Sequence, residues 1–182
     1  MKKTLGVVAA ATLAAMPVMG VFAVDNQFTD NISITIDEVC TLTRAASAHA
    51  SGTDSGSWST TGDTLSKTLT AGTAALDLGS STFHVNCNHT SGYKVTMDAE
   101  GLASGTDNIP YIQTAAAPTV STSEWAVKVG SNYILDNGVV DTTTAPLANA
   151  GKDFTVIYGV AIKDGQAAGT YAGTVTYTLA TL

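Results

Sequence analysis

Residues 154–182, FTVIYGVAIKDGQAAGTYAGTVTYTLATL, decide the fold class. Apolar side chains occupy every second position from Phe154 to Ile162, and in an extended chain this spacing puts them on one side. The alternation returns between Gly173 and Leu179. The intervening KDGQAAG contains an Asp-Gly pair and a second glycine, which is typical of a chain reversal. The stretch therefore predicts a long β-hairpin.

The same period-two pattern recurs in shorter segments along the chain. It is found at 31–36 (NISITI), 82–87 (TFHVNC), 93–97 (YKVTM) and 125–129 (WAVKV). Turn residues between the second and third of these segments predict a hairpin, and Asn137-Gly138 predicts another. No segment has a convincing helical period. About eight or nine short strands separated by turns predict an all-β fold, an antiparallel sandwich.

Composition limits the function classes open to this chain. Its 182 residues suffice for one domain, and only 13% of them are charged, which suits short strands and turns better than long salt-bridged helices. Eight basic residues against fifteen acidic ones give a net charge of −7. Because nucleic-acid binding normally needs a basic face that displaces counterions from phosphates, we expect no nucleic-acid partner.

Residues 1–23 have the features of a secretory signal peptide. A basic start precedes an apolar, Ala-rich run over 5–21, and a small-x-small pattern ends at Ala23. A retained membrane anchor is the competing interpretation, because the run is nearly long enough to span a bilayer. Pro17 and the small residues around the expected cut favour cleavage. We expect residues 24–182 to be one secreted β-sandwich domain with no membrane span.

The chain has two cysteines, Cys40 and Cys87, both beyond the predicted signal. In an exported chain such a pair indicates one disulfide, and two free buried thiols are the alternative. His84 and His89 lie near Cys87, but no second pair of ligands completes a zinc site at the usual spacing. We therefore expect no metal and no other cofactor.

No cluster of residues has the pattern of an active site. There is no GxSxG turn, and the three histidines are not gathered by their spacing. The acidic pairs, such as Asp37-Glu38, fit solvated loops better than a calcium loop or a glycosidase pair. We therefore predict that the protein is not an enzyme, although a secreted hydrolase remains a third hypothesis.

Three aromatic residues are candidates for recognition. Trp58 lies in a loop rich in Ser, Gly and Thr over residues 45–63, where it either covers a sheet edge or anchors a ligand. Trp58, Trp125 and Tyr111 would stack on sugar rings if they gathered on one surface. This is the alternative function, a monomeric secreted module that binds carbohydrate or a host-surface ligand.

Three motifs carry a resemblance to a known group of proteins. They are IDEVCTLTR around the first cysteine, FHVNCNHTSGYKVTM around the second, and the closing GTYAGTVTYTL. In these motifs the chain resembles the spore-coat-U-like and fimbrial-subunit group of bacterial surface proteins, which are similar to chaperone-usher pilins. The resemblance implies an immunoglobulin-like sandwich with Cys40 bonded to Cys87. It also implies a building block or tip component of a surface fibre, involved in cell adhesion.

Subunits of that group lack one strand, and the N-terminal segment of a neighbour fills the gap by β-augmentation. The candidate donor side chains are Phe28, Ile32, Ile34 and Ile36. These residues lie so close to Cys40 that they are also candidates for the domain's own first strand. The resemblance implies copies of the same chain or other surface subunits as partners, together with a periplasmic chaperone.

Overall fold

The computed structural model of this protein describes residues 33–51, 59–61, 64–148 and 150–182. The predicted signal peptide and three candidate residues, Phe28, Ile32 and Trp58, lie outside these ranges. Within the ranges the fold is all-β, with antiparallel strand pairing and no helix, as the sequence predicts. The same ranges consequently hold no helix long and apolar enough to cross a membrane.

The described chain forms twelve strands, more than the eight or nine predicted, because several connections contain strands of only three residues. In chain order they are β1 (Cys40–Ser51), β2 (Ser59–Thr61), β3 (Thr64–Ser66), β4 (Ala74–Cys87), β5 (Tyr93–Ala99), β6 (Leu102–Ser104), β7 (Asp107–Ile109), β8 (Glu124–Val129), β9 (Asn132–Ile134), β10 (Val139–Thr143), β11 (Lys152–Ala161) and β12 (Val175–Thr181).

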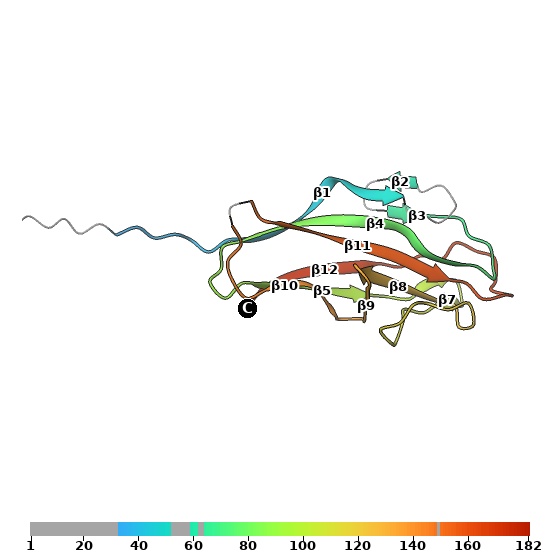
Figure 1. The fold of residues 1–182 in the computed structure, drawn as a ribbon. Helices are drawn as coiled ribbons and strands as arrows, with labels where there is room; N and C mark the ends of the chain where they lie inside the picture. Colours follow the sequence, from blue (N-terminus) through green and yellow to red (C-terminus); the bar gives the residue numbers. More distant parts are fainter. Residues whose placement is uncertain (1–32, 52–58, 62–63, 149) are drawn as a thin grey trace, which may run out of the picture. The chain divides into compact units, whose positions relative to one another are not determined.

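Two larger sheets lie face to face and enclose the core (Figure 1). One has five strands in the order β1-β4-β11-β8-β9, and the other has three in the order β10-β5-β12. The strand pairs β2-β3 and β6-β7 form two small hairpins beside them. An aligned pair of sheets buries alternate residues of each strand and exposes the others, and this is the alternation visible in the sequence.

The three predicted hairpins are wrong, although their turns and strands are present. β11 and β12 belong to different sheets, as do β4 and β5, and also β9 and β10 around Asn137-Gly138. Each connection therefore crosses from one layer to the other. Tyr158 of β11 and Tyr177 of β12 face each other across the interior, with their hydroxyl oxygens 3.2 Å apart. Turn chemistry specifies a reversal, but non-local burial decides which strands pair.

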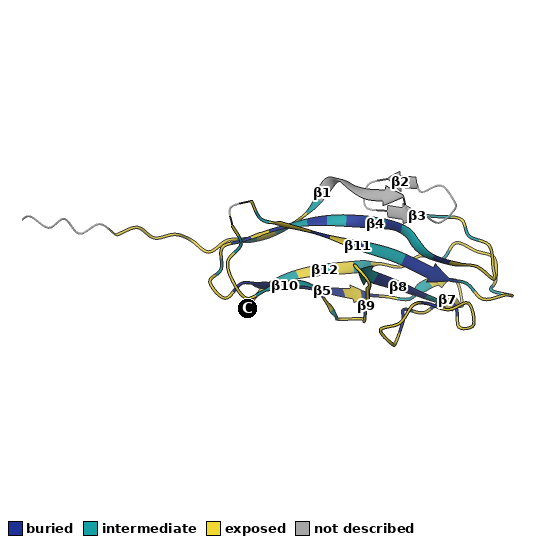
Figure 2. Ribbon diagram, in the orientation of Figure 1, coloured by how far each residue is buried: buried dark blue, intermediate teal, exposed yellow. Residues whose placement is uncertain are grey.

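The core lies between the inward faces of β4, β5, β8 and β11 (Figure 2). Alternate residues of β4 and β5, including Val85 and Val95, are completely buried. The Phe83 ring stacks on Phe154, with centroids 5.3 Å apart, and lies 4.6 Å from the Tyr177 ring of the opposite sheet. Each fully buried side chain of this size stabilises the fold by roughly 1.5–3 kcal/mol.

The predicted disulfide between Cys40 and Cys87 is present. The two residues are direct partners in the β1–β4 ladder, and their Cα atoms are 4.0 Å apart. Cys87 is completely buried and Cys40 is half-buried against the core. The bond thus joins the first residue of β1 to the last residue of β4.

The disulfide lies within one sheet. Asp141 of β10 connects the two sheets to each other near one end. Its carboxylate accepts a hydrogen bond from the Tyr93 hydroxyl of β5 and from the Lys152 ammonium of β11. The Asp141 side chain is only 11% exposed. Burial, followed by this carboxylate, raises the pKa of Tyr93. The group satisfies a phenol that would otherwise be buried without a partner.

We expect that replacing both cysteines by alanine lowers the free energy of unfolding by up to about 4 kcal/mol, because the bond closes a loop of 47 positions in the unfolded chain. Urea unfolding of the oxidised and reduced protein measures the difference. The double variant should not respond to reductant. Identical unfolding of the original protein with and without reductant would contradict the prediction.

We expect Asp141→Ala to lower the free energy of unfolding by about 1–3 kcal/mol, because it leaves the buried Tyr93 hydroxyl without its acceptor. Asp153→Ala is the matched control. Asp153 is 67% exposed and contacts His84 on the surface, so its loss should cost less than about 1 kcal/mol. Equal losses in denaturant titrations of the two variants would show that Asp141 is not a structural link.

Candidate functional site

The residues immediately before β1 expose large apolar side chains. Ile34 is 81% exposed, Ile36 is 80% exposed, and residues 33–39 form no strand. The predicted strand over 31–36, with its isoleucines packed in their own domain, is therefore wrong for residues 33–36. A strand needs a neighbour, and the neighbour of β1 turns away after Cys87. Residues 33–36 keep the alternating pattern of a strand, but no strand among the described residues pairs with them.

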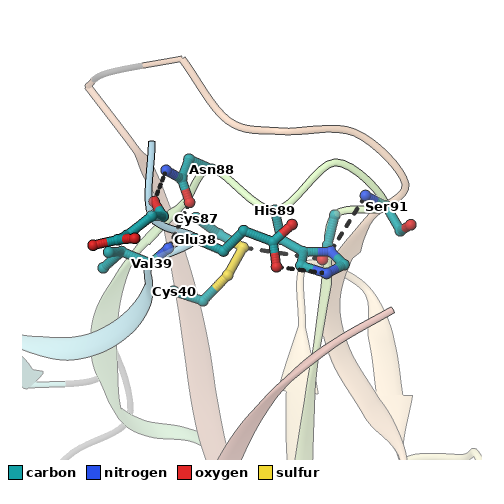
Figure 3. Close-up of polar contacts among 9 residues, drawn as sticks. Glu38, Val39, Cys40, Cys87, Asn88, His89 and Ser91 are labelled. Carbon is teal, nitrogen blue, oxygen red and sulfur yellow. Dashed lines mark hydrogen bonds and ion pairs between the residues drawn. A yellow bond between two sulfur atoms is a disulfide. The ribbon is translucent and has the colours of Figure 1, made fainter. Parts of the chain in front are cut away.

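The side chain of Asn88 holds the last part of this segment (Figure 3). The Val39 amide donates to Asn88 Oδ1 at 2.6 Å, and Asn88 Nδ2 donates to the Asp37 carbonyl at 2.9 Å. The Asn88 amide also donates to the Val39 carbonyl at 3.1 Å. Val39 and Asn88 thus extend the ladder one position beyond the disulfide. At Asp37, where no neighbouring strand is present among the described residues, the Asn88 side chain donates the hydrogen bond that a strand backbone would otherwise supply.

His89 makes a second contact with the same segment. Its Nε2 lies 3.4 Å from Glu38 Oε2, and its Nδ1 accepts a hydrogen bond from the Ser91 amide at 3.3 Å (Figure 3). Because Nδ1 accepts, the proton of the neutral ring is on Nε2 and points to the Glu38 carboxylate. Glu38 is 59% exposed, so this contact contributes little to stability. We call residues 37–40 and 87–89 the N-terminal junction.

On one side of the sandwich the edge strands of the two sheets are neighbours. β1 and β12 are edge strands of different sheets that approach each other, and within the described ranges each pairs with one neighbour only. On the opposite side, the connection around Asn137-Gly138 carries the chain directly from β9 to β10. We call the margin formed by β1 and β12, where each strand has an unpaired edge among the described residues, the open side.

Apolar side chains along the open side are only partly covered. Those packed against the core from its two strands are Cys40 and Leu42 of β1 and Val175, Tyr177 and Leu179 of β12. On β5, the residues that point into the core are buried, whereas β12 has only intermediate and exposed positions (Figure 2). The edge strand β12 is therefore less deeply buried than β5, the central strand of its sheet.

A small hydroxyl cluster lies inside the open side. The Tyr158 hydroxyl is 3.2 Å from both Ser81 Oγ and the Tyr177 hydroxyl. Ser81 is completely buried, and burial is the main cause that raises the pKa of Tyr177, with the neighbouring Tyr158 adding to it. The cluster gives the buried hydroxyls partners inside an otherwise apolar interior.

Two of the candidate recognition aromatics are core residues, which corrects the prediction that they serve an exposed site. Trp125 is 5% exposed and Tyr111 is 4% exposed, and their rings meet edge to face at 4.8 Å. Trp125 Nε1 donates to the Glu100 carbonyl, and the Tyr111 hydroxyl donates to the Ile134 carbonyl. The alternation of Trp125 with Val127 already indicated an inward position.

The described residues contain no group of three or more His, Cys, Asp or Glu that would hold a metal ion. His84 lies on the outer face of β4, with its Nδ1 2.7 Å from Asp153 Oδ1, whereas His89 belongs to the N-terminal junction. The two histidines thus have separate partners. Of the large apolar side chains that the structure shows exposed, Ile34 and Ile36 have the largest exposed fractions, and both lie just before the N-terminal junction.

Sequence reasoning identified Ile34, Ile36 and both cysteines but did not identify Asn88 as more than a turn residue. A signal was present, since an asparagine directly after a strand can bond to the neighbouring backbone through its side chain. Comparison with known proteins adds no assignment, because no family model, curated protein or solved structure matches this chain.

We expect alkaline solution to destabilise the protein through its buried tyrosines. Burial raises the pKa of Tyr111 to about 12 and raises that of Tyr177 as well, so the folded state keeps both phenols neutral. Their contribution to stability is complete below pH about 10, the ordinary tyrosine value, and is lost as pH rises towards 12. Phenolate absorbance followed with circular dichroism measures this. Full ionisation of all tyrosines near pH 10 in a folded protein would contradict it.

Proposed function

We propose that this chain is a secreted bacterial surface subunit, fimbrial or pilus-like, that assembles by strand donation. In this proposal the segment containing Ile34 and Ile36 of one copy adds to the open side of the next copy, between its β1 and β12. The observation that carries the proposal is the presence, in one chain, of an exposed alternating segment and an incompletely covered sandwich edge.

The energetics favour such an exchange. Ile34 and Ile36 are about four-fifths exposed, and burial of each would contribute roughly 1.5–3 kcal/mol. A strand added at a sheet edge also pairs backbone groups that otherwise face water. The same step would cover Leu42, Tyr177 and Leu179, which the described fold leaves partly exposed.

The two surfaces also match in period. Ile34 and Ile36 are two residues apart, and so are the half-buried residues Val175, Tyr177 and Leu179 of β12. In an extended strand this spacing is about 7 Å on one face. A donated strand next to β12 would therefore direct its isoleucines inward, alongside the apolar residues of β12. Its alternate residues, Ser33 and Thr35, would face solvent.

Several features of the sequence agree with this assignment. The signal-like residues 1–23 and the Cys40–Cys87 disulfide suit a protein that leaves the cytoplasm. The resemblance to fimbrial subunits adds an immunoglobulin-like strand arrangement to the proposal. The binding-module alternative loses two of its three aromatic candidates, because Trp125 and Tyr111 lie in the core.

We expect Ile34→Asp with Ile36→Asp to abolish assembly, because two carboxylates cannot enter an apolar core without a large desolvation cost. Ser33→Asp with Thr35→Asp is the matched control. It adds the same charge to the same segment, but on the face that stays in water. Light scattering after gel filtration, unheated denaturing gels and electron microscopy detect the assemblies.

The melting temperature of both double variants should equal that of the original protein, since residues 33–36 belong to no strand and are exposed. Assembly of the isoleucine variant at the original level would overturn the proposal. A protein that stays monomeric at all concentrations and binds a glycan array would instead support the alternative, a secreted binding module.

A further inference from the structure

We infer that Asn88 is a positioning residue that directs the N-terminal segment away from its own open side, so that the segment is donated to another copy instead of capping its own domain. The inference rests on the proposed function and adds a regulatory element to it. In a chain that has both a donor segment and an acceptor edge, the segment could bind to the open side of its own domain. This self-capping would prevent assembly. Some feature of the domain must therefore oppose it.

The N-terminal junction supplies such a feature. Asn88 bonds the Asp37 carbonyl and the Val39 amide through its side chain, and the Val39 carbonyl through its backbone. Cys40 is joined to Cys87 directly beside this clamp (Figure 3). Four consecutive residues, 37–40, are thus kept in extended continuation of β1. The backbone from Asp37 to Val39 is held beside Asn88, immediately before the disulfide-linked start of β1.

Self-capping needs a reversal of the chain. With the junction intact, the reversal would have to occur within residues 33–36, Ser-Ile-Thr-Ile. Three of these four residues are β-branched, and only Ser33 is of a type that turns prefer. Such a turn would also include Ile34 and Ile36, so these side chains could not be buried in a paired strand. The clamp therefore makes donation to another chain the easier route.

Loss of the clamp would move the reversal towards the domain. Asp37 and Glu38 would then be free to form the turn, and Asp is a common turn residue. Ile34 and Ile36 would remain extended and reach their own open side. Asn88→Ala removes both side-chain bonds. Asn88→Asp keeps the acceptor for the Val39 amide but places a carboxylate against the Asp37 carbonyl, so it releases only the outer half of the clamp.

The test places the photoreactive residue p-benzoylphenylalanine at Thr35, on the solvent face of the donated segment, in the full chain. The ratio of cross-links within a chain to cross-links between chains is measured by denaturing gel and mass spectrometry. We expect links between chains for the original sequence. Asn88→Ala should raise the ratio roughly five- to tenfold, as expected for the loss of two modest hydrogen bonds, with a smaller rise for Asn88→Asp. Thr90→Ala, an exposed change in the same turn, should leave the ratio unchanged.

The melting temperature separates positioning from general stability. A role of Asn88 in domain stability alone would lower the melting temperature of Asn88→Ala and leave the cross-link ratio unchanged, and this result would overturn the inference. If Asn88→Ala and the original chain cross-link equally between chains while the Ile34→Asp/Ile36→Asp variant does not assemble, only the inference fails. If the original chain gives no cross-links between chains, the proposed function and the inference both fail.

Discussion

The pairing of β1 with β4 is the constraint on which the other features depend. The disulfide between Cys40 and Cys87 joins the last paired residues of this ladder. Beyond it, Asn88 forms hydrogen bonds with Val39 and with the Asp37 carbonyl. Among the described residues N-terminal of that point, Ile34 and Ile36 belong to no strand and are about four-fifths exposed. The β1–β4 pairing thus ends where the segment with Ile34 and Ile36 begins, and its edge strand β1 also forms one margin of the open side.

The open side follows from the uneven size of the two sheets. A layer of five strands faces a layer of three, and the side chains of β12 are the ones left partly covered. Phe83 and Tyr177 bridge the two layers there, and the Tyr158 hydroxyl satisfies Tyr177 and Ser81. The interior is therefore well packed up to the margin, where apolar surface that would favour a further strand remains. Strand donation is the proposed use of that surface.

The connections of this fold show why turn chemistry alone is a poor guide to pairing. Asn137 has a positive φ of 58°, and the Gly138 amide bonds back to the Leu135 carbonyl, so a tight turn is present as expected. Yet β9 pairs with β8 and β10 pairs with β5, so the two strands on either side of this turn belong to different sheets. Trp125 and Tyr111 illustrate the same point for side chains. Their aromatic character suggested a surface site, and burial against each other made them part of the core.

The sequence by itself determined the all-β class, the inward faces of the strands at 82–87, 93–97 and 125–129, and the cysteine pair, because period-two alternation and cysteine count are local properties. It also identified Ile34 and Ile36 as apolar and in phase. Only the tertiary structure decided that these isoleucines are exposed, that β11 and β12 lie in opposite layers, and that Asn88 bonds to Asp37 and Val39. The physical reason is that most strand pairing in this fold joins residues far apart in the sequence, such as Cys40 with Cys87, and no local pattern specifies which distant neighbour a strand will have.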